Sequence, residues 1–265
     1  MSTRRYFLGL ILGLIPAALR ADILLFGIGR RRNRFSGYDI PPQEVAELYK
    51  LYTQTGGPNW INKTNWFENR QCSTWYGLTV AGGRVTQIDL SNNNLAGVTS
   101  FSPKPFAALT HLRAYRGTSN QTLSMRFALA DLPASMQYLS TYSTQSLITG
   151  SLADLPATIQ SMWLYSTQSL ITGGASAMAA ISIDAIRLQG NANMTIAAKD
   201  DVINRIYADR ALFTYAGHDL NISGGEGPLT GTYQTSASPS TPAEKAYALV
   251  NDPNGELFLK WVITL

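Results

Sequence analysis

The side chains most often used in catalysis are few and scattered in this chain. The only two histidines, His111 and His218, stand about a hundred residues apart, and neither belongs to a metal-binding spacing. Cys72 is the only cysteine, so the chain can form neither an internal disulfide nor a cysteine zinc cluster. Asp131 and Asp154 occupy equivalent places in two LADLP segments, where turn or capping roles are expected rather than a catalytic pair. Without a nucleophile elbow, phosphate loop or dinucleotide fingerprint, the sequence predicts a non-enzymatic protein with no cofactor and no metal.

Recognition by aromatic and basic side chains is the chemistry that the sequence favours instead. Tyr, Trp, His and Arg alternate with apolar residues in a series of short segments. Because alternate side chains of a strand point to opposite faces, these residues would share one exposed surface with the composition of a binding site. The alternative is that the rings only pack against one another across neighbouring strands. The predicted binding residues, on the concave face of the fold described below, are His111, Arg113, Tyr115, Tyr138, Tyr142, Trp163, Tyr165, Arg187 and Tyr215.

Internal repetition indicates which elements carry these side chains. The nonapeptide YSTQSLITG occupies residues 142–150 and again 165–173, and residues 129–150 match residues 152–173 at 16 of 22 positions. A copy that long without a gap predicts a structural unit that is used more than once. The unit reads apolar-x-x-apolar-x-apolar-x-x-(Asn/Thr/Gly). Its copies begin at Val85, Leu109, Met136, Ile159, Ile183 and, more weakly, near Ala211.

This frame resembles the leucine-rich repeat, whose LxxLxLxxNxL pattern recurs every 20–29 residues. The resemblance implies an α/β leucine-rich-repeat solenoid, in which short parallel β-strands alternate with irregular or helical returns and a helical cap closes the N-terminal end. One strand cannot bury its own apolar row, so neighbouring coils must bury it together. The asparagine column that usually bonds to the adjacent turn is interrupted by Gly117, Thr144 and Thr167, which predicts a weakened polar ladder there. The leucines expected in the shared interior are Leu90, Leu139, Leu164 and Leu188.

The segment before the repeats is similar to the N-terminal flanking domain of plant-type and bacterial leucine-rich-repeat proteins. The likeness rests on the motifs LYTQTGGPNW, NKTNW, WYGLTV and GRVTQIDLSNNNLAG. Plant members usually carry a cysteine pair in this cap, whereas Cys72 stands alone here, so packing must hold the cap together. Val45, Leu48, Leu51 and Tyr52 predict the apolar face of a helix. Trp60, Trp66 and Trp75 are expected to cover the open end of the first coil as core residues.

Residues 1–37 form a hydrophobic, arginine-rich arm. Two apolar runs, Tyr6–Leu19 and Ile23–Gly29, are separated by Arg20 and Asp22 and are followed by four arginines within five residues. Three roles stay open: a segment docked against protein subunits or lipid, an export signal of twin-arginine type, or a transmembrane anchor. Residues 1–35 carry a net charge of +6 and the remainder −2, so nucleic-acid binding by the body of the protein is not expected. The low charged fraction of 14% predicts a polar, uncharged surface.

The predicted boundaries are the arm at 1–37, the cap at 38–84, about six leucine-rich repeats at 85–224, and a linker with a C-terminal helix and strand at 225–265. Residues 223–242 are rich in Gly, Ser, Thr and Pro and are expected to lack regular structure. AEKAYALV predicts a short helix and ELFLKWVITL a final strand, whose partner would be the last coil or another chain. This ending is weakly similar to the ends of repeat proteins encoded by tailed bacteriophages.

Two settings stay open for such a recognition protein. In the first, it is a structural component on the surface of a bacteriophage virion, with an adhesive or host-binding face. In the second, it is a bacterial envelope protein, exported or membrane-anchored, that binds a protein or a glycan. The scarce cysteine, the arm and the C-terminal resemblance favour the virion. In both settings residues 1–37 would contact other protein subunits or a membrane, and the concave face would contact a host-surface or partner protein or a glycan.

Overall fold

The computed structural model describes residues 34–114, 122–143, 145–166, 169–175, 183–191, 193–212, 218–251 and 262–265. The chain divides into two compact units, residues 1–36 and 37–265. Almost the whole predicted arm lies outside the described residues, so its three alternative roles stay predictions. The second unit holds every helix and strand among the described residues.

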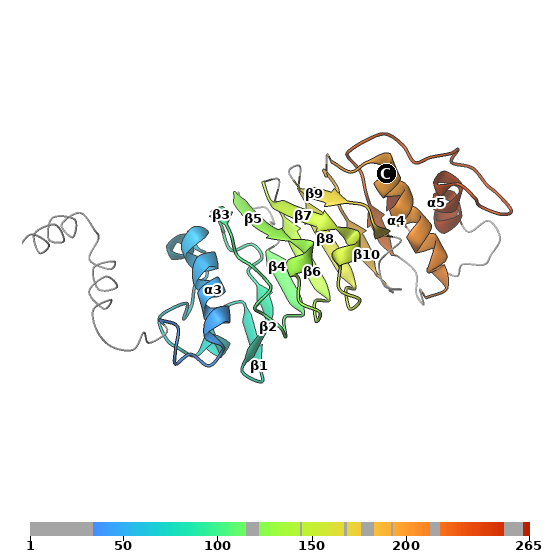
Figure 1. Ribbon diagram of the computed structural model, residues 1–265. Coiled ribbons are helices and arrows are strands. Elements are labelled where there is room, and N and C mark those ends of the chain that lie inside the picture. Colours follow the sequence, from blue (N-terminus) through green and yellow to red (C-terminus); the bar gives the residue numbers. More distant parts are fainter. Residues whose placement is uncertain are drawn as a thin grey trace, which may run out of the picture. The chain divides into compact units, whose positions relative to one another are not determined.

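The second unit is a solenoid whose chain passes alternately through two sheets (Figure 1). The chain turns three times between β2 and β8, and the described strand pairs are parallel except in the β1–β2 hairpin, so the predicted stack of parallel coils is confirmed. The larger sheet contains, in spatial order, β1 (Leu78–Ala81), β2 (Arg84–Asp89), β4 (His111–Ala114), β6 (Tyr138–Tyr142), β8 (Ser161–Tyr165), β10 (Ala185–Arg187), β11 (Asp219–Asn221) and β12 (Val262–Thr264). The smaller sheet contains β3 (Gly97–Thr99), β5 (Leu123–Ala128), β7 (Leu147–Ser151) and β9 (Leu170–Thr172).

The apolar repeat positions form continuous buried rows inside the solenoid. One row is paired in register through six strands, and each of its side chains is at most 2% exposed: Ile88, Leu112, Leu139, Met162, Ile186 and Leu220. Leu90, Leu164 and Leu188 are buried as well, so the interior predicted for the leucines is confirmed. This shared burial is the main stabilising term, since a fully buried Leu or Ile side chain contributes about 1.5–3 kcal/mol.

The two near-identical copies differ in ways that the packing explains. At the inward positions, the exchanges Met136/Ile159, Leu139/Met162 and Thr141/Leu164 all involve buried side chains. The exchanges Tyr138/Ser161 and Ser140/Trp163 involve partly exposed side chains, which alternate with the buried ones along β6 and β8. The exchanges therefore keep the inward positions buried in both copies, while those at the outward positions change the surface.

Serine hydroxyls form much of the polar ladder between coils. Ser143 and Ser166, which are equivalent in the two copies, are buried and donate to the carbonyl oxygens of Leu123 and Ser146 respectively. Ser146 and Ser169, also equivalent and buried, accept hydrogen bonds from backbone N–H groups of the preceding coil, at 3.2 and 3.3 Å. Gly117, Thr144 and Thr167 lie outside the described residues. The sequence frame predicted only a weakened ladder here and missed its replacement by serine.

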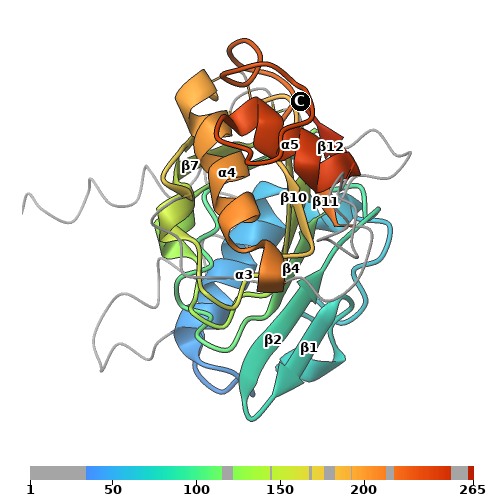
Figure 2. The ribbon, with the colours of Figure 1, turned by 90° about the vertical axis from the view of Figure 1, so that its right-hand side faces the viewer.

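Helices take the place of the smaller sheet's strands after β10. Helix α4 (Ile196–Ala208) follows β10 and α5 (Pro242–Asn251) follows β11, and Figure 2 shows them side by side. Lys245 Nζ on α5 donates to Asn204 Oδ1 on α4 at 2.8 Å. Residues 223–241 contain no helix or strand, as predicted, and β12 pairs in parallel with β11. The last coil, rather than another chain, therefore provides the partner for the C-terminal strand.

The prediction that the sixth repeat begins near Ala211 is wrong. The strand register pairs Leu220, rather than Thr214, with Ile186 of the fifth repeat. Ala211 belongs instead to the short 3-10 helix η7 (Arg210–Leu212), which follows α4. Because α4 lengthens the fifth coil, the described strand within ALFTYAGHDLN is β11 at its end, later than the repeat frame starting at Ala211 indicated.

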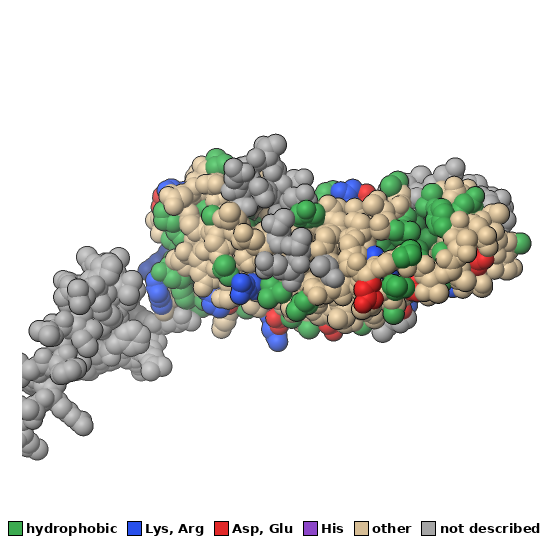
Figure 3. Space-filling model, turned by 90° about the horizontal axis from the view of Figure 1, so that it is seen from above, with side chains coloured by type: hydrophobic (Ala, Val, Ile, Leu, Met, Phe, Trp, Pro, Cys, Tyr) green, Lys and Arg blue, Asp and Glu red, His purple; other side chains and the backbone are tan. Residues whose placement is uncertain are grey.

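Uncharged groups dominate the surface of the described part, seen from above in Figure 3. Lys, Arg, Asp and Glu side chains are scattered between them, as the charged fraction of 14% predicts.

The cap consists of α3 (Pro42–Gln54) and two 3-10 turns, η2 (Gly57–Asn59) and η3 (Cys72–Thr74). The predicted apolar face of α3 is buried at Val45, Leu48 and Leu51, whereas Tyr52 is partly exposed. Trp60, Trp66 and Trp75 are at most 4% exposed, and their rings contact one another with centroids 4.9 and 5.1 Å apart. Each indole N–H donates within the cap, at 2.8–3.2 Å. The prediction that these tryptophans are core residues is confirmed.

Two glycines in the cap motifs are required by close approach. A Cβ at Gly57 would lie 2.3 Å from the ring of Tyr52. Gly77 has φ +77°, and a Cβ there would lie 2.3 Å from the carbonyl oxygen of Asp89. The same Gly77 accepts a hydrogen bond from the Asp89 N–H at 2.7 Å, which fixes the cap against β2.

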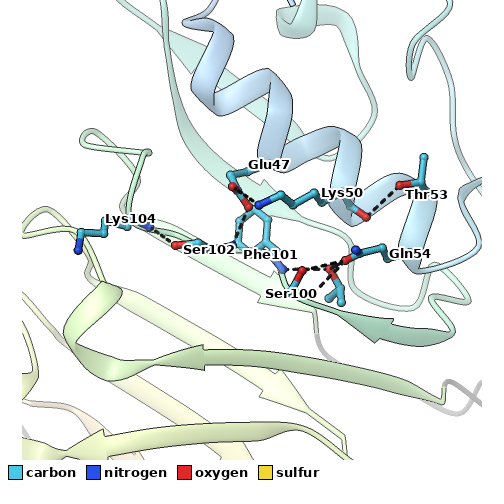
Figure 4. A network of polar contacts seen from close by, with 9 residues as sticks. Glu47, Lys50, Thr53, Gln54, Ser100, Phe101, Ser102 and Lys104 are labelled. Atoms are coloured by element: carbon cyan, nitrogen blue, oxygen red, sulfur yellow. Dashed lines mark hydrogen bonds and ion pairs between the residues drawn. The ribbon is translucent and has the colours of Figure 1, made fainter. Parts of the chain in front are cut away.

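Polar contacts join α3 to the segment that follows β3 (Figure 4). Glu47 Oε2 accepts a hydrogen bond from the backbone N–H of Ser102 at 2.9 Å. Gln54 Oε1 accepts from the N–H of Ser100 at 3.0 Å and from the hydroxyl of Thr99 at 3.1 Å. These bonds supply partners for backbone groups at the edge of the smaller sheet.

A fully buried carboxylate, Glu44, joins α3 to β2. It accepts a hydrogen bond from the N–H of Val85 at 3.0 Å and pairs with Arg84 Nε at 2.8 Å. Burial raises the pKa of Glu44, and the Val85 N–H and the Arg84 guanidinium offset only part of that rise.

Candidate functional site

The predicted binding residues that the structure describes lie on one face of the larger sheet. Two outward rows cross the strands in register: Gln87, His111, Tyr138 and Ser161 in the first, and Asp89, Arg113, Ser140, Trp163 and Arg187 in the second. All of these side chains are partly exposed, and they alternate with the buried core row. We call this surface, with Tyr165 and Asp219 at its border, the open face. Tyr115 and Tyr215 lie outside the described residues, and only the backbone of Tyr142 is described, paired with Tyr165.

Four side chains form a connected group on β2, β4 and β6. The ring of His111 stacks on that of Tyr138, with centroids 4.4 Å apart and an interplanar angle of 24°. The guanidinium carbon of Arg113 lies 5.7 Å from the centre of the same Tyr138 ring, and Arg113 Nη1 lies 3.7 Å from Asp89 Oδ2. Cross-strand contacts of this kind stabilise a sheet by about 0.2–1 kcal/mol each. They also hold the tyrosine ring in one orientation.

His111 is held in its neutral form at this position. Burial lowers the pKa of His111, the positive charge of Arg113 lowers it further, and Asp89 opposes the shift. The hydroxyl of Thr110 lies 2.8 Å from His111 Nδ1. At neutral pH the ring therefore contributes an aromatic surface and hydrogen bonding rather than a charge.

A second group, which also combines an aromatic ring, an arginine and an aspartate, lies on β8, β10 and β11. The guanidinium carbon of Arg187 lies 4.2 Å from the centre of the Trp163 ring, and Arg187 Nη2 donates to Asp219 Oδ2. Trp163 Nε1 and Arg187 Nε are shielded from water and have no acceptor within the described parts of the chain. A buried N–H donor without an acceptor lowers the stability of the folded protein. Packing within the chain alone therefore does not explain why these two groups are placed here.

The other residues with chemical potential have structural surroundings. Cys72 is completely buried, and burial raises the pKa of its thiol, with a further contribution from Asp39, which makes it a poor nucleophile. His218 is also completely buried, with Nδ1 4.0 Å from Asp184 Oδ1. Asp154 accepts from the N–H of Ser151 at 3.0 Å at the start of the 3-10 turn η5 (Leu152–Asp154), so its predicted capping role is confirmed.

Asp131 ends the equivalent turn η4 (Leu129–Asp131) of the first copy. It lies 3.7 Å from Lys104 Nζ. Across the described ranges, no group of three or more His, Cys, Asp or Glu side chains is arranged to hold a metal ion. Nor does any helix described in the structure combine the length and the apolar character that a membrane span requires.

Sequence reasoning found the aromatic and basic members of the open face but not the two aspartates that pair with its arginines. Asp89 lies in the same outward row as Arg113, but its short acidic side chain gave no aromatic or basic signal. Asp219 could not be placed because the sixth repeat was assigned to the wrong segment. A search for an outward acid beside each outward arginine would have found Asp89.

Comparison with known proteins gives no independent assignment. No protein-family model matches the chain, and no curated protein matches it significantly in sequence.

Proposed function

We propose that this chain is a non-enzymatic recognition protein of the leucine-rich-repeat type, which binds a macromolecular partner through the open face. The observation that supports the proposal is the alignment of aromatic and arginine side chains on four adjacent strands, β4, β6, β8 and β10. Tyr, Trp and Arg are the side chains that dominate the binding energy of protein interfaces.

The repeat type is supported by the coil length and by the cap. The duplicated coils are 23 residues apart and each contributes one parallel strand to the larger sheet, which suits the 20–29-residue leucine-rich repeat. The cap motifs contain the buried tryptophans and Gly77, whose carbonyl oxygen accepts a hydrogen bond from Asp89 of the first coil. Two features differ from the usual pattern: serines carry much of the inter-coil ladder, and a second sheet lines the return segments.

The setting that we propose is the surface of a bacteriophage virion, where residues 1–37 attach the protein and the open face contacts the host. The arginine-rich arm, the single cysteine and the C-terminal likeness support it. A bacterial envelope protein anchored by the same arm is the competing setting. Deleting residues 1–35 should release a folded solenoid from the parent assembly, and retention after that deletion would argue against attachment through the arm.

Binding through the open face can be tested by combined substitution. Tyr138, Trp163 and Tyr165 changed together to Ala should weaken adhesion to host cells or to an isolated partner at least tenfold. A matched variant on the smaller sheet, Val98→Ala with Leu170→Ala, removes exposed apolar side chains elsewhere and should leave adhesion unchanged. If both variants and the unmodified protein adhere equally well, the aromatic side chains of the open face only pack against one another and do not bind a partner.

A further inference from the structure

Six aromatic and charged side chains of the open face follow a symmetrical order across its strands. Two rings lie at the centre, one arginine flanks each ring, and one aspartate lies outside each arginine. In strand order from β2 to β11 the residues are Asp89, Arg113, Tyr138, Trp163, Arg187 and Asp219. The two central rings arise because the duplicated coils diverged at the outward positions 138/161 and 140/163.

At the centre, each of the two rings has a small neighbour on the adjacent strand. Tyr138 and Ser161 are neighbours in one row, and Ser140 and Trp163 are neighbours in the next, so each ring has a small serine beside it. The face of each ring that is turned toward its arginine is already covered, by Arg113 and His111 on one side and by Arg187 on the other. An incoming apolar or aromatic side chain would therefore lie over the serines, between the two rings.

The flanking arginines retain hydrogen-bonding capacity. A guanidinium has five N–H donors, and each arginine here has one aspartate as its ion-pair partner, Asp89 at 3.7 Å in the case of Arg113. The side chains of Arg113 and Arg187 are 43% and 37% exposed. Each can therefore receive a carboxylate from a partner, which is the acceptor that matches a guanidinium best. The outer aspartates disfavour a continuous polyanion such as a nucleic acid.

The spacing of the arginines fits an extended peptide. Strands β4 and β10 are three strand steps apart, each about 4.8 Å, so the arginines are separated by roughly 14 Å. An extended chain advances about 3.3–3.4 Å per residue, so residues i and i+4 are separated by roughly the same distance. Side chains at i, i+2 and i+4 of such a chain point to the same side.

From these observations we propose that the open face binds an extended acidic segment of a partner protein that crosses the strands. The segment has the form acidic-x-apolar-x-acidic, its acidic side chains engaging Arg113 and Arg187 and its central side chain lying between Tyr138 and Trp163. This inference rests on the proposed function and specifies the partner's chemistry.

A direct test uses labelled peptides and the full chain. A peptide with the core Glu-Ser-Tyr-Ser-Glu should bind in a fluorescence-anisotropy titration, and its affinity should fall with added salt. The versions Lys-Ser-Tyr-Ser-Lys and Glu-Ser-Tyr-Glu-Ser, which change the charge and the spacing, should bind about tenfold more weakly or worse. Arg113→Gln and Arg187→Gln should each weaken binding of the first peptide by a similar factor. Arg126→Gln, an exposed arginine on β5 of the smaller sheet, should have no effect.

Charge reversal separates a specific contact from damage to the fold. Arg187→Glu should no longer bind the Glu-Ser-Tyr-Ser-Glu peptide but should bind a hybrid peptide with one Glu and one Lys more tightly than the unmodified protein does. An unfolded variant cannot gain affinity in this way. Equal binding of the acidic, basic and respaced peptides, or no binding of any, would overturn the inference. Adhesion to a glycan or to a basic protein that still depends on Tyr138 and Trp163 would also overturn it but would leave the proposed function standing.

Discussion

The hydroxyl of Thr141 is expected to lower the stability of the fold, so replacing it provides a quantitative test of the packing described above. Thr141 is 1% exposed, and its Oγ1 has no hydrogen-bond partner in the described structure. The equivalent residue of the second copy is the buried Leu164, and the strand neighbour on the other side is Ala114. A buried hydroxyl without a partner costs about 1–3 kcal/mol.

Thr141→Val replaces that hydroxyl by a methyl group of similar size and keeps a β-branched residue in the strand. The free energy of unfolding should therefore rise by about 1 kcal/mol or more. For a domain of this size that corresponds to roughly 2–4 °C per kcal/mol in the melting temperature. Thermal and urea unfolding followed by circular dichroism measure both quantities.

The control is Thr158→Val, which makes the same chemical change at a hydroxyl that has partners. Thr158 Oγ1 lies 2.7 Å from the carbonyl oxygens of both Ala134 and Met136, and its single proton can be donated to either. This variant should lose stability, by about 0.5–1.5 kcal/mol. If Thr141→Val is no more stable than the parent, or if the stability of both variants changes in the same direction, the conclusion that the Thr141 hydroxyl lacks a partner and the Thr158 hydroxyl has one is refuted.

Further predictions concern the cap and the C-terminal helix. Gly77→Ala should destabilise the protein by on the order of 2 kcal/mol, because an alanine at φ +77° is strained and its Cβ would meet the Asp89 carbonyl oxygen; an unchanged urea midpoint would contradict this. Because the folded-state pKa of Glu44 is raised above its ordinary value of 4.5, its contribution to stability should grow as the pH falls from neutral toward 4.5 and shrink as the pH rises. The difference in unfolding free energy between the parent and Glu44→Gln should follow that trend, and a difference independent of pH would count against it. Hydrogen bonds from the N–H groups of Ser240 and Thr241 lower the pKa of Glu244 to about 2, so its support of the α5 N-terminus should be lost only as the pH falls from 4.5 toward 2. Relative to their intrinsic exchange rates, the α5 amides should lose protection over that range in the parent, whereas protection in Glu244→Gln should not depend on pH.

The sequence was sufficient for the architecture wherever a local pattern controls the fold. The apolar spacing and the 23-residue copy predicted the register of β4, β6, β8 and β10, because a one-residue slip would turn every buried side chain outward. The cap helix and the burial of its tryptophans followed from apolar periodicity and the motif likeness. The order of the outward residues followed from strand alternation alone.

Other features depend on contacts between coils and could not be read from one repeat. The length of the fifth coil is set by α4, whose packing against α5 has no periodic signal in the repeat frame, so the sixth strand was misplaced. Ser143 and Ser166 belong to the polar part of the duplicated block, and nothing local indicates that they point inward. The pairing of Arg187 with Asp219 joins residues 32 positions apart and requires the correct sixth strand.

The near-identity of the two central coils has a consequence for how this protein can change in length. Residues 129–151 and 152–174 begin and end at matching points of the solenoid, between the same two sheets. Genetic recombination between the two copies would therefore remove or add one whole coil and rejoin the chain without a break in either sheet. Each such event would also move the two arginines of the open face closer together or farther apart by one strand, so a single crossover would change the spacing on which the proposed peptide binding depends.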